Sequence, residues 1–323
     1  MSLLVSPKKR ETLLGVPRNL VRTIADKYLI SGEIKHVSNP LDAAAHIRQI
    51  VVYYEDTYLD YRVWWMSAGA LAMHYGFWDQ KTTNHADAQL NMNRVLAAQA
   101  ELKPNDHVLD AGCGVGGSAI WLAQEFGVRV VGISLLPSEV RRGGRFAQRR
   151  GVADRVTFEC QDFTHTYFPD GSFDVIWAIE SICHAPDKRE FLAEARRLLK
   201  PGGRLVVADG FRSQRPFNSD EERSLDRWLS GWAVPDLMTA EEFADAARQV
   251  GFAYMRLDDI TTNIQPSARR MYHLARVLYP VGIIQRALRL VTSPQLANAR
   301  SALEQYQTLR RGLWFYGIAS AAR

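Results

Sequence analysis

Cysteine is scarce in this chain, with three residues in a sequence of 323. Cys113, Cys160 and Cys183 do not have the spacing of metal ligands, and each falls in or beside a predicted strand end. This pattern indicates buried thiols and favours neither a disulfide framework nor a metal site. The sequence also has no apolar run long enough to span a bilayer, and its first residues lack a secretory signal pattern. We therefore expect a cytoplasmic protein whose chemistry needs no metal.

Long basic runs, internal repeats and low-complexity segments are absent too. The formal net charge is +5, but Lys and Arg are scattered among many carboxylates, and no nucleic-acid-binding module is recognisable. We expect no nucleic-acid partner, since an anionic small substrate or a membrane surface explains the charge balance at least as well. Hydrophobic residues make up 47% and charged residues 23%, so the composition favours a folded globular chain over a disordered one. The sequence does not decide between a monomer and a homo-oligomer.

The most informative stretch is 107–118, where an apolar strand leads into a glycine-rich turn and then into a helix. Asp110 closes the strand, and Gly112 and Gly114 permit backbone conformations and close approaches that a Cβ would prevent. The helix after the turn directs free N–H groups toward whatever lies above it. These features predict a ligand site at this strand end, with a purely structural glycine turn as the alternative.

The nature of the ligand depends on where the acidic residues stand. Dinucleotide-binding folds usually carry Asp or Glu at the tip of the second strand, but here the second strand, 128–133, is followed by Ser134. With Asp110 ahead of its glycines, the stretch resembles motif I of the class I S-adenosylmethionine-dependent methyltransferases. The resemblance implies S-adenosyl-L-methionine as the cofactor. We expect Gly112→Val to abolish cofactor binding with the fold retained, because the added side chain would occupy the space through which the cofactor approaches the turn.

Strands and helices alternate along the middle of the chain. Apolar runs and helical patterns follow one another, in order, at 137–150, 155–160, 173–179, 188–199 and 204–209. The alternation predicts an α/β fold with a doubly wound parallel sheet, whose ligands bind outside the carboxyl ends of the strands. The resemblance implies the Rossmann-like seven-stranded methyltransferase sheet, in which the last strand, here 312–320, is commonly antiparallel.

The regular alternation breaks before and after this core. We divide the chain into an N-terminal helical cap (1–85), an S-adenosylmethionine-binding core (86–210) and the remaining core strands with helical insertions (211–323), forming one continuous catalytic domain. The segments that interrupt the alternation are expected to form a helical lid over the strand ends.

Three further segments resemble methyltransferase sequences around the cofactor. Residues 73–79 resemble the segment that folds over the methionine end of the cofactor in tocopherol-type and sterol methyltransferases, and 132–143 resemble a second segment of the sterol enzymes. Asp162 and Phe163 follow the third strand as motif II does, which implies a carboxylate at the adenine amino group and a ring stacked nearby. The expected cofactor-binding residues are Tyr75, Asp110, Gly112, Gly114, Ser134, Leu135, Glu139, Asp162 and Phe163.

The candidate chemical groups lie just after the fourth strand. Residues 178–188 read Ala-Ile-Glu-Ser-Ile-Cys-His-Ala-Pro-Asp-Lys and closely resemble a segment of the sterol 24-C-methyltransferases; the likeness to these enzymes spans about residues 71–210. If a carbon atom accepts the methyl group, an alkene becomes a carbocation and a base must later remove a proton. Glu180 and His184 are the expected catalytic residues for that step. The resemblance therefore implies C-methylation of an isoprenoid alkene with a Glu base.

Several alternatives remain open at this stage. Glu180 can instead be a positioning carboxylate that holds the cofactor or a lid backbone. Glycoside O-methyltransferases have a related segment with a histidine pair, and this chain has Cys183 in place of the first histidine, which favours carbon over oxygen as the acceptor. An O-methyltransferase of a sugar or natural-product hydroxyl is the second hypothesis, and a non-catalytic cofactor-binding scaffold is the third.

The substrate class depends on the lid segments, which resemble the known families poorly. An aromatic helical stripe before residue 66 places Tyr54, Tyr58 and Trp65 as expected substrate-binding residues, with a core-facing helix as the alternative. Arg269 and Arg270 lie on a predicted helical insertion, where guanidinium groups suit a diphosphate. We therefore expect a small isoprenoid or lipid-like substrate, with a prenyl diphosphate ahead of a sterol and both ahead of a sugar.

Overall fold

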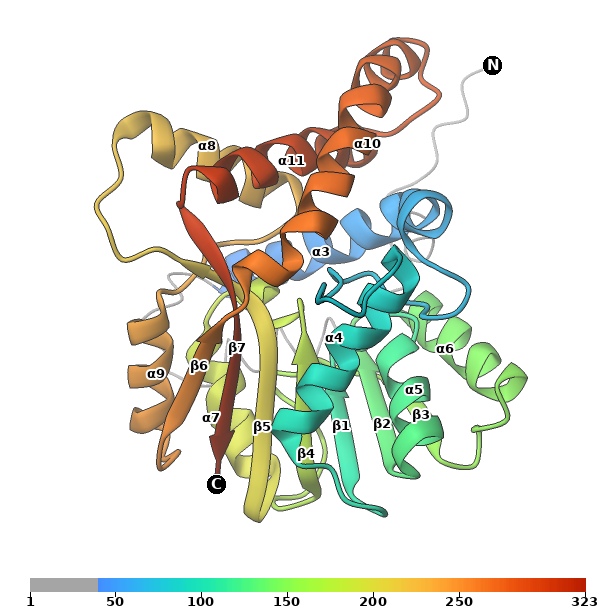
Figure 1. Cartoon of the computed structure of the whole chain (residues 1–323), viewed down its shortest axis with the longest axis vertical. Helices are drawn as coiled ribbons and strands as arrows, with labels where there is room; N and C mark the ends of the chain where they lie inside the picture. Colours follow the sequence, from blue (N-terminus) through green and yellow to red (C-terminus); the bar gives the residue numbers. More distant parts are fainter. Residues whose placement is uncertain (1–39) are drawn as a thin grey trace.

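The computed structural model describes residues 40–323, and a seven-stranded mixed sheet runs through its centre (Figure 1). The strand order is β3-β2-β1-β4-β5-β7-β6, and β7 pairs antiparallel with both of its neighbours, as the sequence predicts. The strands are β1 (His107–Ala111), β2 (Arg129–Ser134), β3 (Val156–Cys160), β4 (Phe173–Ile179), β5 (Leu199–Arg212), β6 (Met255–Asp259) and β7 (Trp314–Ala322). The predicted methyltransferase-type α/β fold is therefore confirmed.

Both faces of the sheet are covered, which explains why its strands read as nearly continuous apolar runs. Val108 and Val175 face one layer while their neighbours Leu109 and Ile176 face the other. The first layer contains α4 (His85–Ala100), α5 (Gly117–Phe126) and α6 (Pro137–Arg149), and the second contains α7 (Lys188–Leu198) and α9 (Ala240–Gln249). Each strand thus buries alternate side chains on opposite sides of one sheet.

A third group of helices, which we call the lid, lies above the carboxyl ends of the parallel strands (Figure 1). It consists of α3 (Pro40–Asp60), the π-helical turn η1 (Tyr61–Trp65), α8 (Ser219–Gly231), α10 (Thr261–Ala287) and α11 (Ser293–Arg310). Reciprocal capping boxes begin α8 at Asn218 and α11 at Thr292, which satisfies backbone N–H groups of their first turns. The described part of the predicted N-terminal cap and the insertions after the core thus come together over one edge of the sheet, while residues 1–39 of that cap lie outside the described residues.

Two elements begin five residues away from the start that the sequence predicts. For the helical insertion, the sequence predicts a start at Pro266, but α10 begins at Thr261, because a proline inside a helix removes one hydrogen bond without preventing the preceding turn. β5 begins at Leu199 instead of Arg204, since Leu199 already pairs with Phe173 of β4. Within residues 40–323, no helix combines the length and the apolar character that crossing a membrane requires.

Candidate active site

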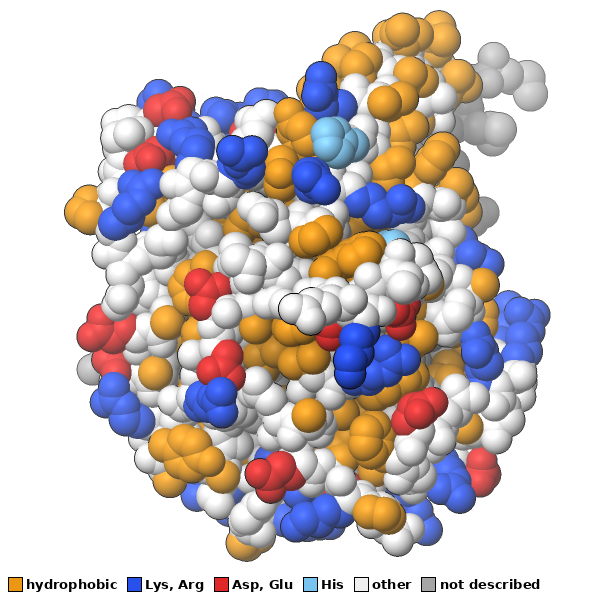
Figure 2. Space-filling view, viewed as in Figure 1, with side chains coloured by type: hydrophobic (Ala, Val, Ile, Leu, Met, Phe, Trp, Pro, Cys, Tyr) orange, Lys and Arg blue, Asp and Glu red, His pale blue; other side chains and the backbone are white. Residues whose placement is uncertain are grey.

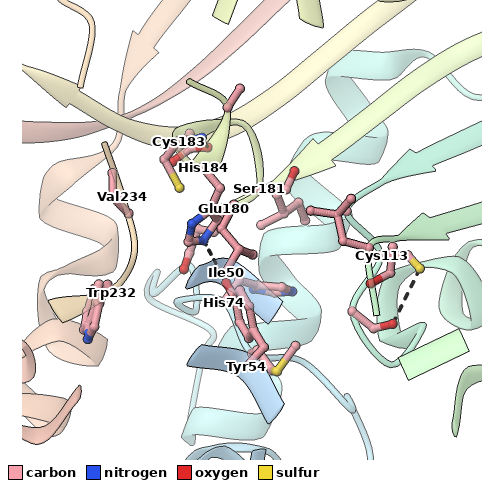
Figure 3. A pocket seen from close by; sticks show the side chains of 18 of the residues that line it. Ile50, Tyr54, His74, Cys113, Glu180, Ser181, Cys183, His184, Trp232 and Val234 are labelled. Carbon is pink, nitrogen blue, oxygen red and sulfur yellow. Dashed lines mark hydrogen bonds between the residues drawn. The ribbon is translucent and has the colours of Figure 1, made fainter. Parts of the chain in front are cut away.

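A large cavity lies between the carboxyl ends of the strands and the lid (Figure 3). Its floor is formed by residues at the ends of β1, β2, β4 and β5, and its roof by α3, η1, α8 and α10. The space inside is about 1700 Å³ with its open mouth included. The cavity thus lies where ligands bind in folds with a parallel sheet, outside the carboxyl ends of the strands.

All of the predicted cofactor-binding residues line this one cavity, although they are spread over ninety positions of the sequence. The parallel strands explain this, because their carboxyl ends meet at one edge of the sheet. The residues are Tyr75, Asp110, Gly112, Gly114, Ser134, Leu135, Glu139, Asp162 and Phe163.

Two buried carboxyl groups in the floor fit a polar ligand. Asp110 is almost fully buried, its Oδ2 atom has no hydrogen-bond partner within the described part of the chain, and burial raises its pKa to about 7. Glu139 accepts a hydrogen bond from the Ser134 hydroxyl at 2.6 Å, and burial raises its pKa to about 7 as well. A buried polar atom without a partner is costly, so an Oδ2 atom aimed at a cavity indicates a place where a ligand donor belongs.

The glycine turn is held by contacts that the sequence does not reveal. Gly112 has a φ of 82°, and a Cβ there would lie 2.3 Å from the Cβ of Ser181. A Cβ on Gly114 would lie 2.6 Å from the terminal methyl of Met73, which belongs to the segment above the turn. A valine at position 112 would therefore collide first with the turn that follows Glu180, in addition to occupying the space expected for the cofactor.

Glu180 stands at the point where β4 leaves the sheet. Its φ is 49°, a left-handed conformation that is uncommon for a residue with a side chain, and its N–H donates to the Ala208 carbonyl of β5. Its Oε1 atom accepts two hydrogen bonds, from the Tyr75 backbone N–H at 2.7 Å and from the Tyr316 hydroxyl at 2.8 Å. The side chain lines the cavity deep in the molecule, and desolvation raises its pKa to about 8. A functional role would explain why this strained conformation is kept.

His184 is held in one tautomer by its neighbours. The Ala233 carbonyl can only accept, so His184 Nδ1 carries the proton of their 3.0 Å hydrogen bond, and Nε2 accepts from the Tyr54 hydroxyl at 2.8 Å. Figure 3 shows Tyr54 of α3 reaching across the cavity toward this ring. Burial lowers the pKa of His184 to about 4, so the imidazole is neutral near pH 7. His184 therefore joins the floor to the lid.

The comparisons with known proteins fit this geometry. A family model described as a methyltransferase domain matches residues 109–207. A sterol 24-C-methyltransferase of Eremothecium gossypii is 30% identical over 263 residues, which make up 79% of this chain and 68% of that protein. The chain belongs to the class I S-adenosylmethionine-dependent methyltransferases. This methyltransferase is thus an enzyme whose methyl donor is S-adenosyl-L-methionine.

Other relatives of the methyltransferase differ in the reaction that their names state. A probable tocopherol O-methyltransferase of rice is 33% identical over 217 residues, which cover 62% of this chain and 60% of that protein. The matched part therefore spans less than two thirds of the rice protein. A solved geranyl diphosphate C-methyltransferase of Streptomyces coelicolor has a TM-score of 0.65 at 21% identity, covering 86% of this chain and 97% of that one. At that identity the likeness shows a shared fold.

Four of the predicted substrate-binding residues of the methyltransferase do not line the cavity. The Tyr58 ring lies under the Arg142 guanidinium, 3.7 Å from its carbon, and Arg269 is exposed. Arg270 is exposed as well and donates to the Trp64 carbonyl at 3.4 Å. Trp65 is buried in the protein core. Of the predicted substrate residues, the structure brings only Tyr54 to the cavity wall.

The position of Trp65 has a local cause. Its indole N–H donates to the His74 carbonyl at 3.2 Å, and its ring packs edge-on against Tyr75. The helical spacing that predicted it assumes an α-helix throughout, but α3 gives way at Tyr61 to a wider π-helical turn. The change of turn alters the direction of each following side chain, so Tyr61 lines the cavity and Trp65 does not.

Several lining residues of the methyltransferase were not predicted. Asp209, the last residue of the run predicted at 204–209, lies within β5, accepts from the Cys183 backbone N–H at 3.0 Å, and has a pKa raised to about 6 by burial. It follows the same strand-end rule that predicted Asp110 and Glu180, so that signal was present in the sequence. The other unpredicted lining residues include these aromatic and sulfur-containing side chains: Tyr61, Met73, Cys113, Trp228, Trp232, Met271, Trp314 and Tyr316.

Proposed function

We propose that this methyltransferase adds a methyl group to carbon in a neutral, largely apolar isoprenoid acceptor, with Glu180 as the base. The observation that carries the proposal is the Glu180 carboxyl, fixed by Tyr75 and Tyr316 in a cavity whose roof is aromatic. Aromatic faces stabilise a transient cation, and a fixed carboxylate can accept its proton. The isoprenoid class rests further on the resemblance to sterol and tocopherol enzymes.

The charge of the cavity wall favours a neutral acceptor over a prenyl diphosphate. Among residues 40–323 the lining contains no Lys or Arg, whereas five carboxyl groups face the same space. A diphosphate would find no guanidinium or ammonium partner there, and its charge would oppose ionisation of the carboxyl groups around it. We therefore place a sterol or a prenylated aromatic compound ahead of a prenyl diphosphate, which reverses the order expected from the sequence. The five carboxyl groups belong to Asp110, Glu139, Asp162, Glu180 and Asp209.

In this proposal the cofactor occupies the β1, β2 and β3 side of the floor. Asp110 and Glu139 provide buried acceptors for hydrogen-bond donors of the cofactor. Asp162 and Phe163 hold its adenine ring. S-adenosyl-L-methionine supplies a methyl group bound to a positively charged sulfur. Residues 70–75 cover the same side of the cavity, because the Met73 methyl lies against Gly114 of the glycine turn. The Tyr75 backbone N–H, at the end of this segment, donates to Glu180 at 2.7 Å.

The proposed reaction has two steps, a methyl transfer and then a proton transfer. The π electrons of the acceptor alkene form the new carbon–carbon bond while the carbon–sulfur bond breaks, and the positive charge moves to the adjacent acceptor carbon. Glu180 then takes a proton from a neighbouring carbon, whose bonding electrons restore a double bond. A pKa of about 8 means that the carboxyl is largely protonated near pH 7 without a cation nearby. Positive charge in the cavity lowers this pKa and so favours the carboxylate form that the step needs.

O-methylation is the second candidate function, and the bond between Tyr54 and His184 favours it. The unprotonated Nε2 atom of His184 points toward the cavity side, where it can receive a proton by way of the Tyr54 hydroxyl. A histidine with a pKa near 4 is nevertheless a weak base for a hydroxyl group. We therefore rank this reaction below C-methylation.

The test is a panel of acceptors incubated with isotope-labelled S-adenosylmethionine and analysed by mass spectrometry. The panel contains geranyl and farnesyl diphosphates, a Δ24 sterol, a tocopherol-type phenol and a glycosylated aglycone. We expect label on carbon of the sterol or the phenol, a loss of that product in Glu180→Gln, and its retention in Tyr54→Phe. Label only on oxygen of the glycoside, lost in Tyr54→Phe, would overturn the proposal in favour of O-methylation.

A further inference from the structure

The far end of α10 projects from the body of the molecule and carries apolar side chains on its surface (Figures 1 and 2). We call residues 276–291, which end α10 and lead to α11, the α10 tip. Six of its large apolar side chains are between 48% and 69% exposed, a level that a packed helix face does not have. They are Val277, Val281, Ile283, Ile284, Leu288 and Leu290.

The exposed residues are arranged as a helix face. Val277, Val281, Ile284 and Leu288 follow one another at spacings of four, three and four, which places the first three on one stripe of α10 and Leu288 at its C-cap. In most surface helices such a stripe is buried against the protein core. Here its members remain open, so the stripe is available to an external apolar phase.

A second exposed apolar group lies on the neighbouring part of the lid. Leu59, Val63 and Trp64 belong to the end of α3 and to η1, and Arg270 of α10 is hydrogen-bonded to the Trp64 carbonyl. In the described part of the chain, only two other large apolar side chains are comparably exposed, Tyr167 and Tyr254. Apolar exposure is therefore concentrated on one end of the lid.

The charge of this region has one sign. From Ile260 to Leu303 the sequence contains six Arg and no Asp, Glu or Lys. Arg276, Arg286 and Arg289 are exposed on the tip itself, and Arg286 donates to a neutral partner, the Ser293 hydroxyl, at 2.9 Å. Blue basic side chains accordingly flank the orange apolar atoms of the projecting helix in Figure 2. The tip thus combines an open apolar stripe with uncompensated positive charge.

We propose that the α10 tip docks this methyltransferase on the surface of an anionic lipid bilayer. An apolar stripe that enters the acyl boundary, flanked by cations that meet anionic headgroups, is the pattern of an interfacial helix. A second copy of the chain fits less well, because a symmetric contact would set arginines against arginines. The inference goes beyond methyl transfer and does not depend on which acceptor is used.

The test measures co-sedimentation of the full chain with vesicles of equal parts phosphatidylglycerol and phosphatidylcholine, and with vesicles of phosphatidylcholine alone. We expect binding to the anionic vesicles that weakens at high salt. The double variant Ile284→Asp, Leu288→Asp should reduce that binding at least about tenfold. Arg276→Glu with Arg286→Glu should reduce it by a similar factor on anionic vesicles and leave neutral vesicles unaffected. Tyr254→Asp, a change at an equally exposed apolar residue away from the tip, is the matched control and should bind like the wild type.

A tryptophan probe and a measurement of self-association make the test decisive. Ile284→Trp should show fluorescence quenching by brominated lipids, which reports insertion of the tip itself. Failure of the wild type to bind anionic vesicles would overturn the proposal, as would equal binding by the Ile284→Asp, Leu288→Asp variant. Wild-type self-association that this variant abolishes, seen by sedimentation velocity without vesicles, would assign the tip to a second copy instead. Unchanged cofactor binding by the variants shows that they are folded.

Discussion

The floor and the lid of the cavity are built from opposite kinds of residue. The floor holds four carboxyl groups whose pKa values burial raises, those of Asp110, Glu139, Glu180 and Asp209. The lid presents aromatic rings to the cavity and, on its outer side, exposed apolar residues and arginines. The floor is thus suited to a cation and to polar groups of a cofactor, whereas the lid is suited to an apolar molecule.

The two regions also differ in how their positions are determined. Each floor residue lies near the carboxyl end of a parallel strand, just after it, or in the first turn of the helix that follows, so the sheet itself brings these residues together. Lid residues come from helices whose mutual packing depends on many contacts far apart in the sequence. The position of the floor residues therefore follows from a local rule, whereas that of the lid residues depends on the packing of distant segments. The following variants test that division.

The largest effect is expected at Glu180. Glu180→Gln should lower kcat by roughly a thousandfold, because the proton acceptor is lost while the shape and both hydrogen bonds can remain. Affinity for S-adenosylmethionine, measured by calorimetry, should change by less than about threefold. Tyr316→Phe is the milder comparison, since it removes one hydrogen bond and keeps the carboxylate. Parallel losses of kcat and affinity in Glu180→Gln would assign the residue to positioning.

A smaller effect is expected at the glycine turn. Gly112→Ala should destabilise the fold by roughly 2 kcal/mol, because the residue is held at a positive φ and its Cβ would collide with Ser181. Gly114→Ala should cost less, since its contact is the flexible end of Met73. Urea denaturation of the two variants checks the order. Equal stabilities would show that the turn relaxes freely and that Ser181 does not constrain it.

The pH dependence of the free energy of unfolding should show whether the Glu180 carboxyl is protonated in the folded, unliganded protein. Its pKa is raised in the folded state, so its contribution to stability is complete below its unfolded pKa and is lost as the pH rises through about 8. Glu180→Gln does not titrate and keeps a neutral group there. Between pH 5 and pH 9 the Tm of the variant should therefore rise relative to the Tm of the wild type, and the difference between the two should grow with pH. Parallel curves would mean that Glu180 is already ionised in the unliganded protein.

The smallest effect is expected on the outer side of the lid. Arg269→Ala should leave kcat/KM within about twofold of wild type, because Arg269 is exposed and does not line the cavity. The same result is expected for Arg270→Ala. Steady-state kinetics with the acceptor identified in the panel provides the check. A collapse of activity in Arg269→Ala would show that the lid closes and brings this guanidinium to the acceptor.

The floor could be predicted from the sequence because its rule is local. A buried strand followed by a polar residue marks the sheet edge, and this correctly placed Asp110, Asp162 and Glu180 at one cavity. The same rule, applied to the strand predicted at 204–209, would have found Asp209. Tyr316 could not be found in this way, because β7 runs antiparallel and brings the start of a strand, not its end, to that edge.

The lid was predictable only as a set of helices. Capping boxes mark the starts of α8 and α11, and the sequence predicts a helical insertion over the region of α10 and α11, but neither signal says which side chains reach the cavity. The direction of Trp65 depends on the π-helical turn, and that of Met271 on how α10 lies over β7. These are consequences of packing between distant segments, which a pattern along one segment does not contain.

The place of β7 in the sheet has a consequence for biosynthesis. β7 follows every other strand in the sequence, yet it lies between β5 and β6. During translation the edge of β5 that pairs with β7 therefore stays unpaired until more than a hundred further residues have been synthesised. The insertion of β7 closes that edge and in the same movement delivers the Tyr316 hydroxyl to Glu180. A nascent chain that has not yet inserted its last strand thus cannot assemble the complete hydrogen-bonded setting of that carboxyl, which delays competence for chemistry until the sheet is finished.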